Sequence, residues 1–358
     1  MKITGINTSS VTIPLNTVFR TALRSVEKIE NVIVTVTTDS GPVGYGSAAP
    51  TTVITGETTA SIIGAIDHID TALRGMELDN HELVFRRLNR CIVGNTSAKA
   101  AVDMAIYDLL AKSLGIPLYR LLGGIAHRVE TDITISLDDI GTMVADSRRR
   151  LSEGFNILKV KVGSDPQLDI ERLEQISRAV GDQVTIRIDA NQGWSAKAAV
   201  QVGSELARRR IPIELMEQPV KARSWSELAF VRAHAPMPVY ADESFFSPGD
   251  ALELIKSDAV DGINIKLMKC GGIYNALKIA AIADAASIPC MIGSMMECSI
   301  SVTAAAHLAA ATSNITGCDL DAPLFCSRSP GVGGISYSGA EIVLPAEPGL
   351  GISRILDL

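Results

Sequence analysis

The sequence predicts a mixed α/β protein: a modified TIM barrel of the (β/α)7β type, preceded by an α+β domain that caps it. From about residue 130 onward, eight short β-branched segments alternate with helical segments at intervals of roughly 25 residues. Eight such units predict a closed barrel of parallel strands. The eighth strand is followed by 322-APLFCSRSP, which is not a full helix, so we expect the last unit to be incomplete.

The first 122 residues have a different pattern, which predicts a small capping domain. Two alternating segments, 1-MKITGINTSSVTI and 31-NVIVTVTT, indicate strands of an antiparallel sheet. Helical periodicity follows in 57-ETTASIIGAIDHIDTAL and 97-SAKAAVDMAIYDLLAKSLG. We therefore assign residues 1–122 to an α+β domain.

Residues 123–322 contain the predicted barrel. Segments such as 166-PQLDIERLEQISRAVG and 273-IYNALKIAAIADAAS supply its helices. A doubly wound sheet is the weaker alternative, because no G-x-G-x-x-G opens a first βα unit. The tail, residues 323–358, includes 334-GISYSGAEIVLPAEPGLGI, and we expect it to fold back onto the capping domain. The eight strands are expected in 130-ETDITIS, 156-NILKVKV, 184-VTIRIDA, 213-IELMEQP, 238-PVYADES, 262-GINIKL, 289-PCMIGS and 315-ITGCDLDA.

Composition excludes several classes of protein. The net charge of −7 gives no electrostatic footprint for nucleic acid, and no apolar run approaches the length of a membrane span. The N-terminal segment lacks the apolar centre of a signal peptide. Six cysteines show no C-x-x-C pairing, which favours reduced thiols over a disulfide scaffold or a structural zinc site. We therefore expect a cytoplasmic protein that binds neither nucleic acid nor membrane.

Ionisable residues fall at the ends of the predicted barrel strands, where enzymes with this fold keep their chemistry. Any one of these residues alone could belong to a structural ion pair. Because they recur at the end of one strand after another, an active site explains them better. Strands two to six and strand eight carry them, in order: Lys159 with Lys161, Asp189, Glu217, Asp242, Lys266, and Asp319 with Asp321.

Three carboxylates, Asp189, Glu217 and Asp242, end the adjacent strands three, four and five. They would repel one another strongly unless a cation lies among them. Hard oxygen ligands favour Mg²⁺, with Mn²⁺ as the alternative. None of the five histidines falls at a strand end, which argues against zinc or a facial-triad iron site.

Strands two and six are four apart in a ring of eight, so Lys161 and Lys266 should approach a bound molecule from opposite sides. Lys159 is two residues from Lys161 and points to the same face of the strand. Two positive charges so close together lower the pKa of one of the amines, which can then serve as a general base. Lys159 can stay charged and stabilise negative charge on a substrate. The alternative is a structural ion-pair network with the neighbouring acids, which leaves Lys266 unexplained. Two opposed bases beside a divalent cation indicate a 1,1-proton transfer α to a carboxylate through an enediolate, that is, racemisation or epimerisation.

These motifs resemble the enolase superfamily, in the subgroup of the muconate-lactonising enzymes. The segments that carry the likeness are 159-KVK, 189-DAN, 217-EQP, 242-DES and 264-NIKLMKCGG. A histidine on strand seven would mark the mandelate-racemase branch, but 289-PCMIGS has none. By this resemblance Asp189, Glu217 and Asp242 are the Mg²⁺ ligands, Lys161 and Lys266 are the bases, Asn191 supports the ligands, and the N-terminal domain covers the site.

Within that subgroup the chain is most similar to dipeptide epimerases, over nearly its whole length. The segment 319-DLD places Asp319 and Asp321 on one face of strand eight, opposite the metal ligand of strand four. Two carboxylates there suit a substrate ammonium group, and the family uses the D-x-D pair in this way. An Asx-type cap after the strand is the plainer explanation of Asp321.

Three residues outside the barrel motifs bear on specificity. In the Ala-Glu epimerases of this family an arginine in the position of Arg24 pairs with the substrate's glutamate side chain, and a guanidinium suits a carboxylate by charge and shape. An ordinary exposed arginine is the plainer explanation, and Arg20 or Lys28 could serve instead. Ser47 departs from the acidic residue that many relatives have there. Glu297, after strand seven, is expected to shape the pocket, without an assigned role.

The resemblance implies a Mg²⁺-dependent dipeptide epimerase that converts L-Ala-L-Glu to L-Ala-D-Glu in cell-wall peptide metabolism, as a homo-oligomer. Hydrophobic and cationic dipeptides stay open as substrates. The rival reactions are N-acyl amino acid racemisation, o-succinylbenzoate synthesis and cycloisomerisation, none of which needs an ammonium site. A barrel that binds a small acid through Mg²⁺ without catalysis is the alternative from another class.

Overall fold

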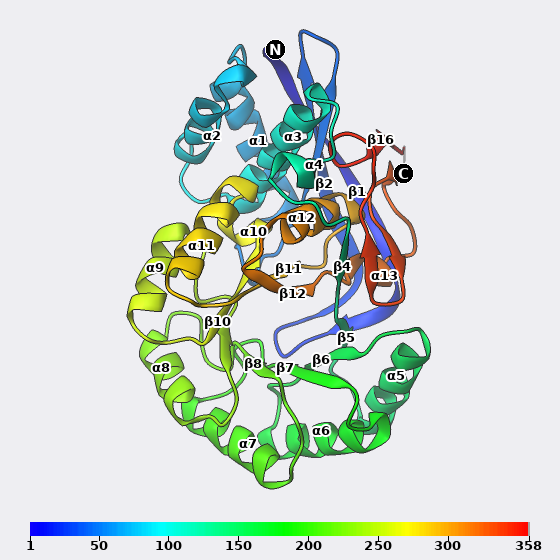
Figure 1. Cartoon of the computed structure of the whole chain (residues 1–358), viewed down its shortest axis with the longest axis vertical. Helices are drawn as coiled ribbons and strands as arrows, with labels where there is room; N and C mark the ends of the chain where they lie inside the picture. Colours follow the sequence, from blue (N-terminus) through cyan, green and yellow to red (C-terminus); the bar gives the residue numbers. More distant parts are fainter. Residues whose placement is uncertain (357–358) are drawn as a thin grey trace.

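The computed structural model describes residues 1–356, and its centre is a barrel of eight parallel strands (Figure 1). The strands follow one another around the sheet in chain order. The first and last strands also meet, because the Asp132 N–H donates to the Cys318 carbonyl at 3.1 Å. All eight predicted strands are confirmed. They are β5 (Ile133–Ile135), β6 (Ile157–Lys161), β7 (Thr185–Asp189), β8 (Leu215–Glu217), β9 (Val239–Ala241), β10 (Gly262–Lys266), β11 (Cys290–Gly293) and β12 (Ile315–Asp319).

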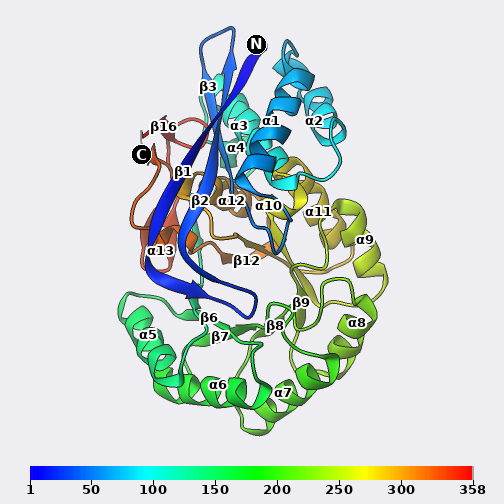
Figure 2. The same cartoon turned by 180° about the vertical axis from the view of Figure 1, so that it is seen from behind.

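Helices surround these strands on the outside, as the alternating pattern predicted (Figures 1 and 2). Four of them begin at a residue whose side chain caps the first turn: Asp139, Asp165, Ser195 and Ser247. After β12 only the four-residue α13 (Ala322–Phe325) follows, so the last unit is incomplete as predicted. The outer helices are α5 (Ile140–Ser152), α6 (Pro166–Val180), α7 (Ala196–Arg208), α8 (Trp225–His234), α9 (Pro248–Lys256), α11 (Ile273–Ala285) and α12 (Ser299–Ala311), with the short α10 (Leu267–Cys270) after β10.

The N-terminal part forms an antiparallel sheet of three strands in chain order, backed by helices. The long hairpin of β1 and β2 extends from this sheet toward the barrel, where the Leu137 N–H donates to the Arg20 carbonyl at 3.0 Å (Figure 2). The turn of the hairpin is thereby held over the strand ends. The elements are β1 (Ile3–Arg20), β2 (Ser25–Thr38), β3 (Val43–Ala48), α1 (Thr59–Leu73), the 3-10 turn η1 (Leu78–Asn80), α2 (His81–Arg90), α3 (Thr96–Ser113) and α4 (Leu118–Leu121).

The tail returns to the N-terminal elements. The Ser327 N–H donates to the Pro14 carbonyl at 3.0 Å, and the Leu118 N–H donates to the Gly349 carbonyl at 2.8 Å. The boundaries 1–122, 123–322 and 323–358 stay predictions, and the last two residues of that tail lie outside the described residues. Two small antiparallel sheets stiffen the tail, one of β4 (Arg128–Glu130), β14 (Ser336–Ser338) and β15 (Glu341–Val343), the other of β13 (Gly331–Gly333) and β16 (Ile352–Ile355).

Two further features concern the described residues as a whole. Within residues 1–356 no helix combines the length and the apolar character needed to cross a membrane. All six cysteines are free thiols, and four of them are buried.

Close packing of β3 against α3 leaves no room for a methyl group at Gly46. A methyl group at Gly46 would lie 1.9 Å from the Ala101 carbonyl oxygen. Gly46→Ala should therefore lower the free energy of unfolding by about 1–3 kcal/mol or more, measured by urea denaturation. Gly64→Ala in α1 is the control, because its methyl group meets no atom within 4 Å and should leave stability equal or slightly raised. Equal stability of the two variants would contradict this packing.

Candidate active site

A pocket lies where the capping elements cover the carboxyl ends of the barrel strands. The cap contributes residues of the β1–β2 hairpin and of the loop after β3, and the barrel contributes strand-end residues. This is the side of the barrel on which the sequence placed its ionisable residues. Among the lining residues are Phe19, Arg24, Val53 and Ile54 from the cap, and Lys161, Asn191, Asp242, Glu243, Lys266, Met295, Met296, Asp319 and Asp321 from the barrel.

A row of carboxylates lies beside this pocket at the ends of three barrel strands, and of its three acids Asp242 is part of the lining. Asp189, Glu217 and Asp242 end three successive strands, and Asp189 is the direct neighbour of Glu217 across the sheet. All three are at most 2% exposed. The barrel therefore brings together the three acids that the sequence grouped.

The two predicted bases stand at the two ends of this row. Lys161 Nζ lies 2.6 Å from Asp189 Oδ2, and Lys266 Nζ lies 2.8 Å from Asp242 Oδ2. Three strands separate β6 from β10, so the ammonium groups meet the row from opposite sides. Both lysines line the pocket and are only 5–6% exposed.

Lys159 lies beneath the pocket and links the acids of three strands. Its Nζ is 2.7 Å from Asp319 Oδ2, 2.8 Å from Glu217 Oε2 and 3.2 Å from Asp189 Oδ2. Burial alone lowers the pKa of Lys159, but the charges of Asp319, Glu217 and Asp189 outweigh burial and hold this pKa well above its ordinary value. Lys159 is thus a fixed positive charge. The ion-pair network considered as the alternative exists, and it coexists with the opposed pair of lysines.

Burial and neighbouring charges shift the pKa values of the three acids of the row in different directions. Burial raises the pKa of Asp242, but the ammonium groups of Lys266 and Lys269 outweigh it and hold that pKa far below its usual range. For Asp189, burial is outweighed by Lys161 and Lys159, which bring the pKa to about 2. For Glu217 burial prevails, and its pKa is raised. The outer two acids are therefore carboxylates at neutral pH.

Several supporting groups were not identified from the sequence. Asn264 Nδ2 donates to Glu217 Oε1 at 3.0 Å, and Lys269 Nζ lies 2.7 Å from Asp242 Oδ1. Asn191, which was predicted, donates to Asp189 through its backbone N–H at 2.8 Å and through its side chain at 3.3 Å. Both lie within the quoted 264-NIKLMKCGG: Asn264 alternates with Lys266 along β10, which was the available signal for it, whereas Lys269 lies in α10 and gave no such signal.

The donor set fits a hard divalent cation. Glu217 Oε2 and Asp242 Oδ1 are buried and accept no hydrogen bond of good geometry, although lysine ammonium groups lie 2.8 and 2.7 Å away. Oxygen atoms of three carboxylates without a nitrogen or sulfur donor are the ligands that Mg²⁺ prefers. Asp189, Glu217 and Asp242 are therefore the residues that could hold this ion.

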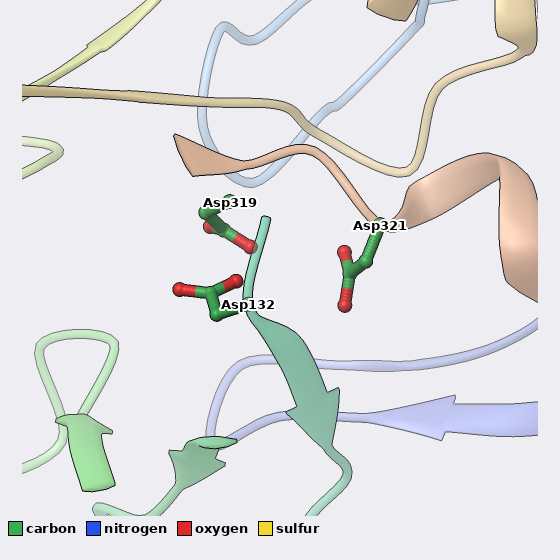
Figure 3. A group of neighbouring side chains, drawn as sticks. All are labelled: Asp132, Asp319 and Asp321. Carbon is green, nitrogen blue, oxygen red and sulfur yellow. The ribbon is translucent and has the colours of Figure 1, made fainter. Parts of the chain in front are cut away.

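A second acidic group lies on the opposite wall. Carboxylate oxygens of Asp132, Asp319 and Asp321 all fall within 4.8 Å of one another, a grouping that could hold a cation (Figure 3). Asp132 lies behind the pocket and binds Arg187 at 2.9 Å, whereas Asp319 and Asp321 line the pocket. Asp132 was missed because its segment 130-ETDITIS gave no sign that it faces strand eight.

Asp321 is not an Asx-type cap. It occupies the N-cap position of α13 but makes no capping hydrogen bond, and its Oδ2 accepts from the Thr134 N–H at 2.6 Å instead. Burial, with Asp319 adding to it, raises the pKa of Asp321 to about 6. This side chain is thus turned toward the barrel and the pocket.

The cap residues take different places. Arg24 lines the pocket, and burial lowers the pKa of its guanidinium. No hydrogen bond or ion pair holds that guanidinium among residues 1–356. Arg20 pairs with Asp138, and Lys28 lies 3.8 Å from Glu30 on the surface, so neither lines the pocket.

Glu297 and Ser47 lie just outside the pocket lining. Glu297 Oε1 accepts from the Met295 N–H at 2.8 Å and so supports a lining segment, while burial raises the pKa of Glu297 to about 6. Ser47 Oγ accepts from Cys298 Sγ at 3.3 Å, which places the departure from the family pattern at the seam between cap and barrel.

Comparison with known families gives two matches that together cover most of the chain. Residues 3–123 match the model described as the mandelate racemase / muconate lactonizing enzyme N-terminal domain. Residues 142–355 match the model described as enolase C-terminal domain-like.

Individual relatives match over nearly their full length. An L-Ala-D/L-Glu epimerase of Clostridium acetobutylicum is 50% identical over 346 residues, which are 96% of this chain and 97% of the relative. The structure of a substrate-liganded complex of the L-Ala-D/L-Glu epimerase from Bacillus subtilis superposes with a TM-score of 0.98 at 46% identity, covering 99% of this chain and all of that one. A dipeptide epimerase from Enterococcus faecalis, complexed with Mg and L-Leu-L-Tyr, has a TM-score of 0.96 at 43% identity, with coverage of 99% and 100%.

The buried ion pairs of Lys159 can be tested without a substrate. Lys159→Met, studied with a chelator present, should lose about 3–5 kcal/mol of stability at pH 8, because it leaves buried carboxylates unpaired. The loss should shrink as pH falls, because removal of the Lys159 charge raises the folded-state pKa of the acids it paired and lets them become neutral at lower pH. Lys197→Met, an exposed substitution on α7, is the control and should change stability little at any pH. A loss for Lys159→Met that is the same at pH 8 and pH 5 would contradict the ion-pair account.

Proposed function

The chain belongs to the mandelate racemase / muconate lactonizing enzyme family of the enolase superfamily, and we propose that it is a Mg²⁺-dependent dipeptide epimerase. The observation that carries this proposal is the pair of lysines at opposite ends of a carboxylate row, with Lys161 on β6 and Lys266 on β10. A reaction that removes a proton from one side of a carbon and returns it to the other needs such a pair. The epimerases named among the relatives support the same assignment.

Asp189, Glu217 and Asp242 would hold the Mg²⁺ ion, supported by Asn191. When bound, the ion supplies positive charge for the substrate carboxylate and so favours loss of the neighbouring α-proton. Mn²⁺, with the same preference for oxygen, is the alternative. The Mg complex of the Enterococcus faecalis relative supports this choice.

Lys161 and Lys266 act as the two catalytic bases. One amine removes the α-proton of the C-terminal residue, giving an enediolate of the substrate carboxylate, and the ammonium group on the other side returns a proton to the opposite face. Lys159 stays protonated and stabilises the negative charge that develops between them. The cap covers the pocket and excludes water from this step.

Asp319 and Asp321 bind the substrate's ammonium group. Asp319 ends β12 and Asp321 follows it at the start of α13, and both line the pocket across the barrel from the carboxylate row. A molecule with a carboxylate at one wall and an ammonium group at the other is a dipeptide. This ammonium group is missing from N-acyl amino acids, o-succinylbenzoate precursors and muconates. The racemase, synthase and cycloisomerase alternatives therefore do not explain the presence of Asp319 and Asp321.

The preferred substrate is L-Ala-L-Glu, converted to L-Ala-D-Glu. Arg24 supports this choice, because its guanidinium lines the pocket and lacks a protein counter-ion in the described residues. A glutamate side chain would supply that counter-ion. Hydrophobic dipeptides are the second candidate, favoured by Val53, Ile54 and the two methionines in the lining. Glu297 would act by shaping the segment that holds Met295.

The proposal also covers the location, the cellular role and the partners of the protein. The free thiols support a cytoplasmic location. The resemblance to Ala-Glu epimerases supports a role in recycling or degrading cell-wall peptides. Assembly as a homo-oligomer follows from the resemblance, and the net charge of −7 argues against a nucleic-acid partner.

Incubation of dipeptides in D₂O with Mg²⁺ tests the function directly. Both L-Ala-L-Glu and L-Ala-D-Glu should exchange the α-hydrogen of the glutamate residue and interconvert, as followed by proton NMR. Chelation of the metal should stop both processes, and added Mg²⁺ should restore them. A barrel that only binds acids would show saturable binding with no exchange across a library of dipeptides, and that result would refute the proposal.

Replacement of Arg24 tests the side-chain specificity. Arg24→Met should lower kcat/KM for L-Ala-L-Glu by roughly 10- to 100-fold, because a charge-assisted contact to the substrate carboxylate is lost. The same variant should keep or raise activity on L-Ala-L-Leu. Lys28→Met, on the neighbouring strand with its ammonium exposed, is the matched control and should change neither value. Equal losses on both dipeptides would assign Arg24 a structural role instead.

A further inference from the structure

Gly293 ends strand β11 directly beside Lys266. The two residues are paired neighbours in the parallel ladder of β10 and β11. Side chains at paired positions of parallel strands point to the same face of the sheet, and Lys266 points into the pocket. A side chain at position 293 would therefore also point into the barrel mouth.

The space above Gly293 is already filled by its neighbours. A methyl group there would lie 3.0 Å from Lys266 Cε and 2.8 Å from Asn264 Oδ1. The contact with Asn264 is too short for nonbonded atoms, so that side chain would have to move, and the Lys266 stem would have to give way by a few tenths of an ångström. Lys266 reaches Asp242 from this place, and Asn264 donates to Glu217.

Backbone conformation gives no second reason for the glycine. The φ angle of Gly293 lies outside the left-handed region that other residues avoid. Alanine can therefore adopt this backbone without strain, and a substitution tests added volume alone.

We propose that Gly293 is a positioning residue for Lys266: the missing side chain leaves the space through which the lysine stem reaches its place at one end of the carboxylate row. The catalytic part of this inference rests on the proposed function. Since Lys161 stands at the other end, far from Gly293, an added methyl group should impair proton transfer on the Lys266 face more than on the Lys161 face.

The asymmetry gives a kinetic signature. Gly293→Ala should slow interconversion of the two epimers by roughly 10-fold, because the stem shifts by a few tenths of an ångström, whereas a full 1 Å costs about 100-fold. Exchange of the α-hydrogen in D₂O should persist for the epimer that Lys161 deprotonates and be slowed more for the other. The less affected epimer should be the same as in Lys266→Ala and opposite to that in Lys161→Ala.

A second barrel glycine serves as the control for general overpacking. In Gly317→Ala the new methyl group would meet Met291 and Arg187 at 3.2 and 3.4 Å, not Lys266. Any loss in this variant should be equal for the two epimers. Full epimerisation by Gly293→Ala, or equal loss of exchange from both epimers, would overturn the proposal.

A crystal structure of the Gly293→Ala variant keeps the proposal testable whatever the substrate is. Lys266 Nζ should have shifted from its position 2.8 Å from Asp242 Oδ2, while Lys161 keeps its contact with Asp189. An unmoved Lys266 would overturn the positioning role. If the wild-type enzyme exchanges no α-hydrogen in any dipeptide, the proposed function fails, and this structure alone decides the role of Gly293.

Discussion

The barrel mouth depends on one constraint, the pairing of buried carboxylates with buried ammonium groups. Asp189, Glu217 and Asp319 are at most 5% exposed, so unpaired charges there would cost several kcal/mol each. Lys159 meets all three acids, and it can do so only because strands β6, β7, β8 and β12 converge on the barrel interior. The fold and the charge pattern therefore require each other.

The parallel arrangement of the strands turns this constraint into a site. Lys159 and Lys161 alternate with apolar residues along β6, so both enter the barrel, Lys159 one layer deeper than the pocket and Lys161 at its wall. The deeper lysine is a fixed charge, and the outer ones at β6 and β10 flank the row of acids. A divalent ion would bind the same acids from the pocket side, and its charge would loosen the lysine contacts that now hold them.

Much of this could be predicted from the sequence, for physical reasons. The strand period and the regular spacing of βα units place residues such as Asp189, Glu217 and Asp242 at neighbouring strand ends without any tertiary information. Contacts that depend on side-chain direction were beyond the pattern. Asp132 beside Asp319 and the hydrogen bond from Asn264 to Glu217 arise from packing across the barrel.

The cap was harder to predict than the barrel. Three cations of the first hairpin, Arg20, Arg24 and Lys28, could each pair with a substrate carboxylate by charge, and only the family resemblance favoured Arg24. The course of the hairpin separates them, since Arg20 meets Asp138 and Lys28 faces outward. Glu297 likewise could not be placed from its position after strand seven, because its carboxylate turns back to the Met295 N–H rather than into the pocket.

The most direct test of the central claim is a crystal structure of the protein with Mg²⁺ and L-Ala-L-Glu. The account predicts that the α-carbon of the glutamate residue lies between Lys161 Nζ and Lys266 Nζ, one on each face of the plane that forms when its proton leaves. A complex in which both nitrogens approach the same face, or in which either points away from that carbon, would contradict it.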